Sequence, residues 1–143
     1  MALLGLVTLN DLRLKGDTIA LQTINSSFES NRILFNPRSR LTIKRVGIIT
    51  ATTLATSDTN YYTFQIINKG QSGSGTATIL DTTGSVNTTK ATGGSGLTGY
   101  VTRFFALNSA NVTVNKDDVL TIVGTKTASP SDLTSSAFYI EWI

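Results

Sequence analysis

The sequence has no histidine and no cysteine, and only nine of its 143 residues are acidic. Without cysteine, the fold can contain neither a disulfide nor a thiolate metal site. Without histidine, it lacks the side chain that most often transfers protons near neutral pH. Catalysis would depend on a few carboxylates, lysines and hydroxyls, so we expect a protein that is not an enzyme and that uses no cofactor and no metal.

The acidic residues are also poorly placed for catalysis. Asp117 and Asp118 form the only adjacent acidic pair. Neighbouring residues of a strand point to opposite faces, so these two carboxylates are not expected to share a proton. Aspartate is typical of turns, and we interpret the pair as a solvated turn. A glycosidase would need two cooperating carboxylates in one cleft, so we predict no small-molecule substrate.

Long apolar segments are missing as well. The start of the chain is apolar, but no basic residue precedes this segment, and Gly5, Thr8 and Asn10 interrupt it. It is therefore much shorter than the ~20 residues of a membrane span and lacks the charged start of a secretion signal. We expect no membrane partner, and the cellular compartment stays open at this point.

What the chain does contain is Ser, Thr and Asn, which together make up about a third of it. These residues alternate with Val, Ile, Phe and Tyr in short runs, a pattern typical of strands with one buried face. The last run, Ser136 to Ile143, alternates throughout, with Phe138, Ile140 and Trp142 on one side. Roughly eight such runs and no helical periodicity predict an all-β, antiparallel, jelly-roll-like sandwich, with a single barrel as the alternative.

The same alternation predicts local features of particular segments. Within Arg40 to Ala55, the apolar residues move from one face of the expected strand to the other, which indicates a bulge or bend beside Gly47. The segment Gly99 to Asn108 is apolar on both sides and is expected to be a central strand. Residues 81–99 are expected to form a long exposed connection. The runs before and after Asn115-Lys116-Asp117-Asp118 are expected to be antiparallel strands joined by a tight turn.

We predict a single sandwich domain over residues 18–143, preceded by a separate segment of 17 residues. They alternate weakly and end in Lys15-Gly16-Asp17, which is typical of a turn, so they form either an edge strand or an extended arm. Their apolar residues could cover a sheet edge of the same domain or cross to a neighbouring subunit. These candidate oligomer or capsid contacts are Leu3, Leu4, Leu6, Val7 and Leu9.

Positive charge is concentrated in one part of the chain, although the formal net charge is only +3. Residues 31–57 contain five basic residues and no acidic one: Arg32, Arg38, Arg40, Lys44 and Arg45. This run is either a solvated face or a docking site for an acidic protein surface, an anionic glycan or a nucleic acid. Binding of single-stranded nucleic acid would need interleaved aromatic rings, and only Phe35 is near, so a nucleic-acid partner is not expected.

Over residues 60–143, the order of motifs resembles that of capsid decoration, or cement, proteins of tailed bacteriophages. The motifs are Tyr61-Tyr62-Thr63-Phe64-Gln65-Ile66-Ile67, Gly73-Ser74-Gly75-Thr76-Ala77, residues 112–121 (VTVNKDDVLT) and Ala137-Phe138-Tyr139-Ile140-Glu141-Trp142. The resemblance implies a homotrimer on the exterior of the virion that binds the major capsid protein and stabilises the assembled capsid. The docking and arm residues named above would then be the capsid-facing contacts.

The alternative is a receptor-binding or glycan-binding tip domain of a phage tail or fibre protein. Such a domain would grip host glycans with loops such as residues 72–75 and 82–95, where exposed aromatic rings are expected. These loops contain no Trp, Tyr or Phe, which favours the decoration protein.

Overall fold

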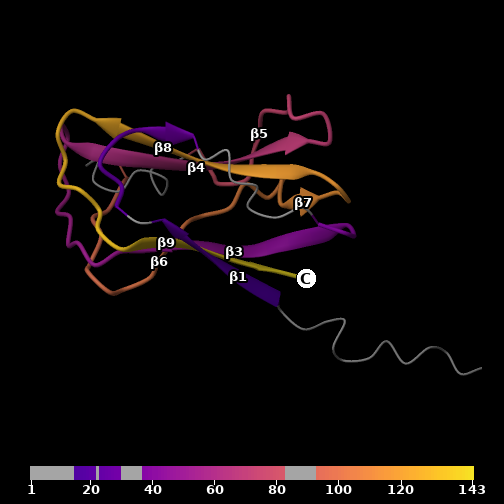
Figure 1. Cartoon of the computed structure of the whole chain (residues 1–143), viewed down its shortest axis with the longest axis horizontal. Coiled ribbons are helices and arrows are strands. Elements are labelled where there is room, and N and C mark those ends of the chain that lie inside the picture. Colours follow the sequence, from indigo (N-terminus) through magenta and orange to yellow (C-terminus); the bar gives the residue numbers. More distant parts are fainter. Residues whose placement is uncertain (1–14, 22, 30–36, 83–92) are drawn as a thin grey trace, which may run out of the picture.

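The computed structural model describes residues 15–21, 23–29, 37–82 and 93–143. In these residues the chain forms nine strands and no helix, and every strand pair is antiparallel. Figure 1 shows the strands in two layers that face each other. The predicted all-β antiparallel sandwich is therefore confirmed.

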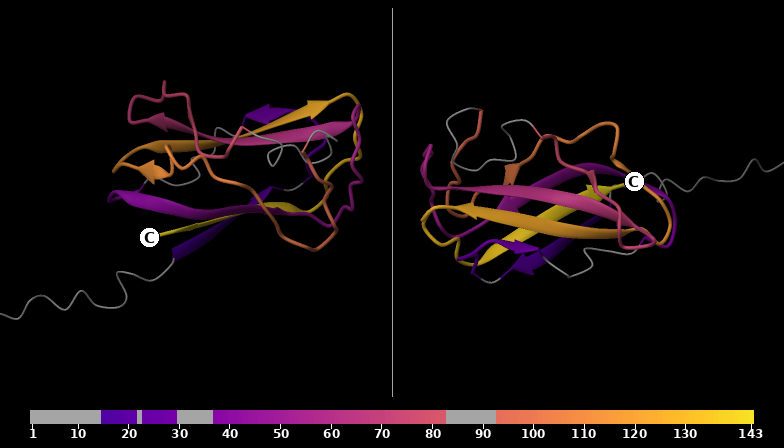
Figure 2. Two further views of the ribbon diagram at one scale, coloured as in Figure 1. Left: turned by 180° about the vertical axis from the view of Figure 1, so that it is seen from behind. Right: turned by 90° about the horizontal axis from the view of Figure 1, so that it is seen from above.

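Each layer is one sheet. The first has the order β1-β9-β3-β6, with β7 also pairing to β3, and its strands are β1 (Lys15–Leu21), β9 (Ser136–Trp142), β3 (Leu41–Ile49), β6 (Arg103–Phe104) and β7 (Thr113–Val114). The second has the order β2-β8-β4-β5, and its strands are β2 (Phe28–Glu29), β8 (Val119–Thr127), β4 (Tyr61–Gly70) and β5 (Ala77–Thr78). Both layers are visible from behind and from above in Figure 2.

The pairing is nested, as in a jelly roll. The first strand pairs with the last (β1 with β9), the second with the second to last (β2 with β8), β3 with β6 and β7, and β4 with its neighbour β5. The contacts of β9 with β3 and of β8 with β4 then complete the two sheets. A long hairpin wrapped around a sandwich gives this order, so the jelly-roll architecture follows from the observed pairings.

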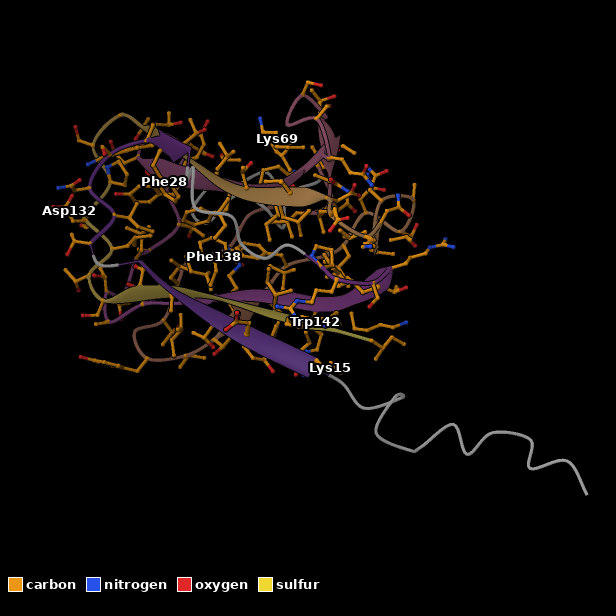
Figure 3. All side chains as sticks on the ribbon, turned by 45° about the vertical axis from the view of Figure 1, so that its right-hand side comes forward. Lys15, Phe28, Lys69, Asp132, Phe138 and Trp142 are labelled. Carbon is orange, nitrogen blue, oxygen red and sulfur yellow. The ribbon has the colours of Figure 1, made fainter. Side chains whose placement is uncertain are left out.

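Four aromatic rings pack among the aliphatic side chains between the sheets: Tyr62, Phe64, Phe105 and Phe138. Phe64 of β4 lies 5.3 Å from Phe138 of β9 and 6.1 Å from Phe105, measured between ring centroids, and it stacks on Tyr62 at 6.0 Å. Figure 3 places Phe138 between the two layers. The buried Tyr62 hydroxyl donates to the Ile24 carbonyl oxygen at 3.1 Å, which satisfies its one polar atom. These rings join the two sheets into one core.

The prediction for the start of the chain was partly wrong. Lys15-Gly16-Asp17 is not a turn, because β1 begins at Lys15 and pairs with β9 from Trp142 to Ser136. The proposed boundary between residues 17 and 18 therefore falls inside a strand, and β1 is an edge strand of the first sheet. The apolar residues Leu3, Leu4, Leu6, Val7 and Leu9 lie outside the described residues.

The predicted bulge in β3 exists, but it lies before Gly47. Ile43 is opposite Trp142 and Arg45 is opposite Glu141, so Lys44 is the inserted residue. The insertion moves the buried positions from Leu41 and Ile43 to Val46 and Ile48, in agreement with the change of side read from the sequence.

The prediction of a central strand over Gly99 to Asn108 was wrong. Only Arg103 and Phe104 form a strand, and β6 lies at the edge of its sheet. Phe105 points into the core while Phe104 stays 42% exposed on the outer face. Tyr100 has a positive φ of 61°, which takes the backbone out of the extended region before β6 begins.

The β7–β8 connection also differs from the prediction. β7 pairs with β3 in the first sheet, whereas β8 pairs with β4 in the second. The turn therefore joins the two layers and does not close a hairpin.

Candidate functional site

The first candidate surface is one end of the sandwich, where β1, β3 and β8 begin and β4 and β9 end. We call it the basic end and define it by Arg38, Arg40 and Lys44. Arg38 and Arg40 immediately precede β3, and Lys44 is the bulge residue of that strand. Figure 1 shows this end on the right, at the side of the label C.

The three side chains of the basic end are exposed, and none forms an ion pair with another described residue. The exposed Lys15 begins β1 at the same end (Figure 3). The described acidic side chains near this end are Asp17, Asp117, the buried Asp118 and Glu141, which is paired with Arg45, so the exposed charge is mainly positive. Because these guanidinium and ammonium groups are exposed and no other described residue compensates them, they are available to an acidic surface.

The buried Asp118 side chain fixes the turn at the basic end by hydrogen bonds. It is only 6% exposed, and its Oδ2 accepts a hydrogen bond from Asn68 Nδ2 at 2.9 Å and another from the Asn115 backbone N–H at 3.0 Å. The interpretation of the acidic pair as a solvated turn is therefore wrong for Asp118. It fits Asp117, whose side chain is 56% exposed and only 4.0 Å from the exposed Lys116 ammonium.

The turn is also attached to the segment that carries the basic residues. The Asp117 backbone N–H donates to the carbonyl oxygen of the buried Pro37 at 2.9 Å, and Gln71 Nε2 donates to the Lys116 carbonyl oxygen at the same distance. Pro37 directly precedes Arg38. The basic end is thus positioned by contacts from both sheets.

Two of the five predicted docking residues do not join this group. Arg32 lies outside the described residues. Arg45 lies on the outer face of the first sheet, where its Nη1 is 3.5 Å from Glu141 Oε2 and its guanidinium carbon is 3.9 Å from the centre of the Phe104 ring. The charge of Arg45 is compensated there, so its role differs from that of Arg38, Arg40 and Lys44.

The second candidate surface is a groove on that outer face, with a volume of about 390 Å³. We call it the aromatic groove, and it is lined by Thr18, Arg45, Ile49, Thr102, Phe104 and Tyr139. The strand registers explain why these residues meet: Thr18 is opposite Tyr139, Tyr139 is opposite Gly47, and Gly47 is opposite Phe104. Four strands thus contribute one row of side chains to the same face.

Gly47 leaves room for this arrangement. A Cβ atom at this position would be 3.0 Å from Phe104 Cδ1 and 2.9 Å from Thr102 Cγ2. The two rings that flank Gly47 in this row, Phe104 and Tyr139, have centroids 6.4 Å apart and planes at 67°. Glycine therefore lets the Phe104 ring lie against the sheet.

The polar groups beside the groove are coupled to one another. The Tyr139 hydroxyl donates a hydrogen bond to Glu141 Oε1. This hydrogen bond is the largest cause that raises the pKa of Tyr139, and burial and the charge of the Glu141 carboxylate act in the same direction. The positive charge of Arg45 has a smaller, opposite effect on this pKa. Glu141 Oε2 is shielded from solvent and accepts no hydrogen bond from the residues that the structure describes, although Arg45 lies 3.5 Å away. Sequence analysis missed the groove, because it depends on registers among four strands.

An exposed aromatic segment precedes the groove wall. Tyr100 is 80% exposed and Val101 55%, and the Tyr100 backbone N–H donates to the Thr50 carbonyl oxygen at 2.7 Å. Leu97, 3% exposed, exchanges two backbone hydrogen bonds with Leu54 at 2.8 and 2.9 Å. The carboxyl end of the predicted exposed connection is therefore fastened to the β3–β4 loop, while residues 83–92 lie outside the described residues.

Within the described ranges, no group of three or more acidic side chains is arranged to hold a metal ion. The same ranges contain no helix with the length and apolar character of a membrane span. No family model, no curated protein and no solved structure matches the chain significantly.

Proposed function

We propose that this chain is a structural protein of a phage virion that binds the outside of the assembled capsid through its basic end. The observation that carries the proposal is the grouping of Arg38, Arg40 and Lys44, exposed and uncompensated by described residues, on a base held by both sheets. Cations presented on a rigid scaffold favour docking on an acidic protein surface, because little conformational freedom is lost on binding.

The connectivity of the chain also supports the basic end as the surface that faces the capsid. Residue 14 is covalently followed by β1, which begins at Lys15 at this end. The fourteen residues before β1 can reach at most about 50 Å when fully extended, enough to contact a neighbouring subunit. The apolar residues of this segment would add hydrophobic contact to the electrostatic contact of the basic end.

The resemblance to decoration proteins supports the remaining parts of the proposal. The motifs that carry it fall mainly on β4, β8 and β9, strands of a jelly-roll sandwich. On this proposal the protein is a homotrimer, its partner is the major capsid protein, and its binding raises the resistance of the capsid to heat or internal pressure. It does so without enzymatic chemistry and without a cofactor.

The proposal is tested by co-sedimentation of the protein with assembled heads that lack it. Changing Arg38, Arg40 and Lys44 together to Ala should weaken binding by about ten- to a hundredfold, because exposed charge contacts contribute about 0.5–1 kcal/mol each. Binding should also weaken as salt is raised. Arg45 is left unchanged, because it contacts Phe104 and Glu141 within the fold.

A charge-conserving control tests whether docking depends on charge. The double variant Arg38→Lys, Arg40→Lys keeps the positive charge and should bind nearly as well as the natural sequence if the contact is electrostatic. Equal binding by the triple Ala variant, or a native mass that shows only a monomer together with no binding to heads, would overturn the proposal. Binding to tails instead of heads would favour a tail or fibre tip domain.

A further inference from the structure

The aromatic groove is an open hollow with a mixed lining. Its volume of about 390 Å³ falls in the usual range of ligand sites, about 300–1,000 Å³. Phe104, Tyr139 and Ile49 supply apolar surface, while Thr18 and Thr102 supply hydroxyls. A ligand that fits this lining must itself combine apolar faces with polar edges.

The lining keeps hydrogen-bonding capacity that no described contact uses. The hydroxyls of Thr18 and Thr102 form no hydrogen bond with another described residue. A guanidinium carries five N–H donors, and the contact of Arg45 Nη1 with Glu141 Oε2 at 3.5 Å leaves most of them for other partners. Donors and acceptors therefore both remain for a ligand with several hydroxyl groups, which can act in both ways.

The charge of the site argues for an uncharged ligand. Arg45 is the one charged side chain in the lining, and Glu141 compensates it at 3.5 Å. An anionic group such as a phosphate would have to compete with this carboxylate.

The wall that carries Thr102 and Phe104 is held in place before any ligand binds. Gly99 N–H donates to Thr53 Oγ1 at 3.0 Å, and Tyr100 N–H donates to the Thr50 carbonyl oxygen at 2.7 Å. Tyr100 keeps a φ of 61°, a strained value for a bulky residue that persists only where surrounding contacts enforce it. Such pre-organisation lowers the entropic cost of binding.

We propose that the aromatic groove binds a neutral saccharide, of a size of one or two pyranose rings. The apolar C–H face of a pyranose would lie against Tyr139 and Ile49, beside the Phe104 ring that Arg45 covers at 3.9 Å. Its ring hydroxyls would meet the hydroxyls of Thr18 and Thr102 and the remaining N–H donors of Arg45. The groove lies on the outer face of the first sheet, and its two threonines and two rings are absent from the basic end. The saccharide site therefore shares no residue with the docking group Arg38, Arg40 and Lys44.

The test uses the full chain and an array of neutral hexose and N-acetylhexosamine oligosaccharides, with sialylated and sulfated versions beside them. We expect at least one neutral oligosaccharide to bind, and calorimetry with it then gives the affinity of each variant. Phe104→Ala should weaken binding at least tenfold by removing the apolar wall. Thr102→Val, which changes the shape of the side chain little, should weaken it about fivefold by removing one hydroxyl.

Ile143→Ala is the matched control, because Ile143 is also 42% exposed and lies outside the groove. Its affinity should equal that of the natural sequence. If Phe104→Ala unfolds, Thr102→Val keeps the test decisive. The proposal is overturned if no neutral oligosaccharide binds, if only charged ones do, or if Phe104→Ala and Thr102→Val bind unchanged. It is also overturned if Phe104→Ala dissociates an oligomer, which would make this face a contact between copies of the chain.

Discussion

Replacement of Asp118 by Ala should destabilise the protein far more than a change at its neighbour Asp117. Asp118 is 6% exposed and accepts two hydrogen bonds, from Asn68 Nδ2 at 2.9 Å and from the Asn115 N–H at 3.0 Å. Its removal leaves both donors without this acceptor. A buried donor left unsatisfied costs about 1–3 kcal/mol, so we expect a loss of about 2–4 kcal/mol in the free energy of unfolding.

Two further variants separate the mechanism from a general effect of mutation. Asp118→Asn keeps one oxygen that can accept from the same donors, so its loss should be smaller than that of Ala. Asp117→Asn should cost less than about 0.5 kcal/mol, because the side chain is half exposed and Asn tolerates its φ of 64°.

The assay is equilibrium unfolding in guanidinium chloride, followed by circular dichroism and by the fluorescence of Trp142, the one tryptophan in the chain. In a thermal scan, a loss of 2–4 kcal/mol corresponds to a fall of about 6–16 °C in Tm for a domain of this size. The reasoning is refuted if Asp118→Ala loses less than Asp117→Asn, or if Asn and Ala at position 118 are equivalent.

Three more predictions concern the core and the outer face. Phe64→Ala should lower the free energy of unfolding by about 3–5 kcal/mol in the same assay, because the ring is fully buried among three others. Gly47→Val should cost at least about 1–3 kcal/mol, because its side chain would overlap Phe104; a neutral effect would contradict the described approach. The raised pKa of Tyr139 means that the folded state holds this proton more tightly than the unfolded state, so stability should fall above about pH 10. Tyr139→Phe should reduce that fall, measured by unfolding at pH 9 and pH 11; an unchanged difference would show that the hydrogen bond to Glu141 has no such effect.

The parts of the fold that sequence analysis predicted correctly are those in which burial alternates along one strand. Phe138 and Ile140 point into the core as their spacing in β9 indicated. In β3, the change of side between Ile43 and Val46 correctly indicated a bulge. The sequence alone does not show whether the extra residue lies before or after Arg45, because both positions give the same apolar spacing. The register against β9 places it at Lys44.

The errors arose where a residue's environment depends on a distant segment. Asp118 looks like a turn residue in sequence, and its burial depends on Asn68, fifty positions away. The segment around Phe104 looks like a two-sided strand, but the positive φ of Tyr100 and the close approach to Gly47 direct its rings to different environments. Alternation alone cannot distinguish a central strand from a short edge strand with a bent entry.

The same reason explains what could be predicted of the candidate sites. The run from Arg38 to Lys44 was visible as a local excess of charge, so the basic end could be proposed from sequence. Arg45 belongs to the same run, yet its partners Glu141 and Phe104 come from β9 and β6. Neighbours in sequence thus serve different surfaces, and only the strand registers separate them.

The most direct measurement is an electron cryomicroscopy map of assembled heads with the protein bound, compared with heads that lack it. The account predicts added density on the outside of the capsid, into which the jelly-roll sandwich fits with Arg38, Arg40 and Lys44 facing the major capsid protein. Density in which the basic end faces solvent, or heads that gain no density when the protein is present, would contradict it.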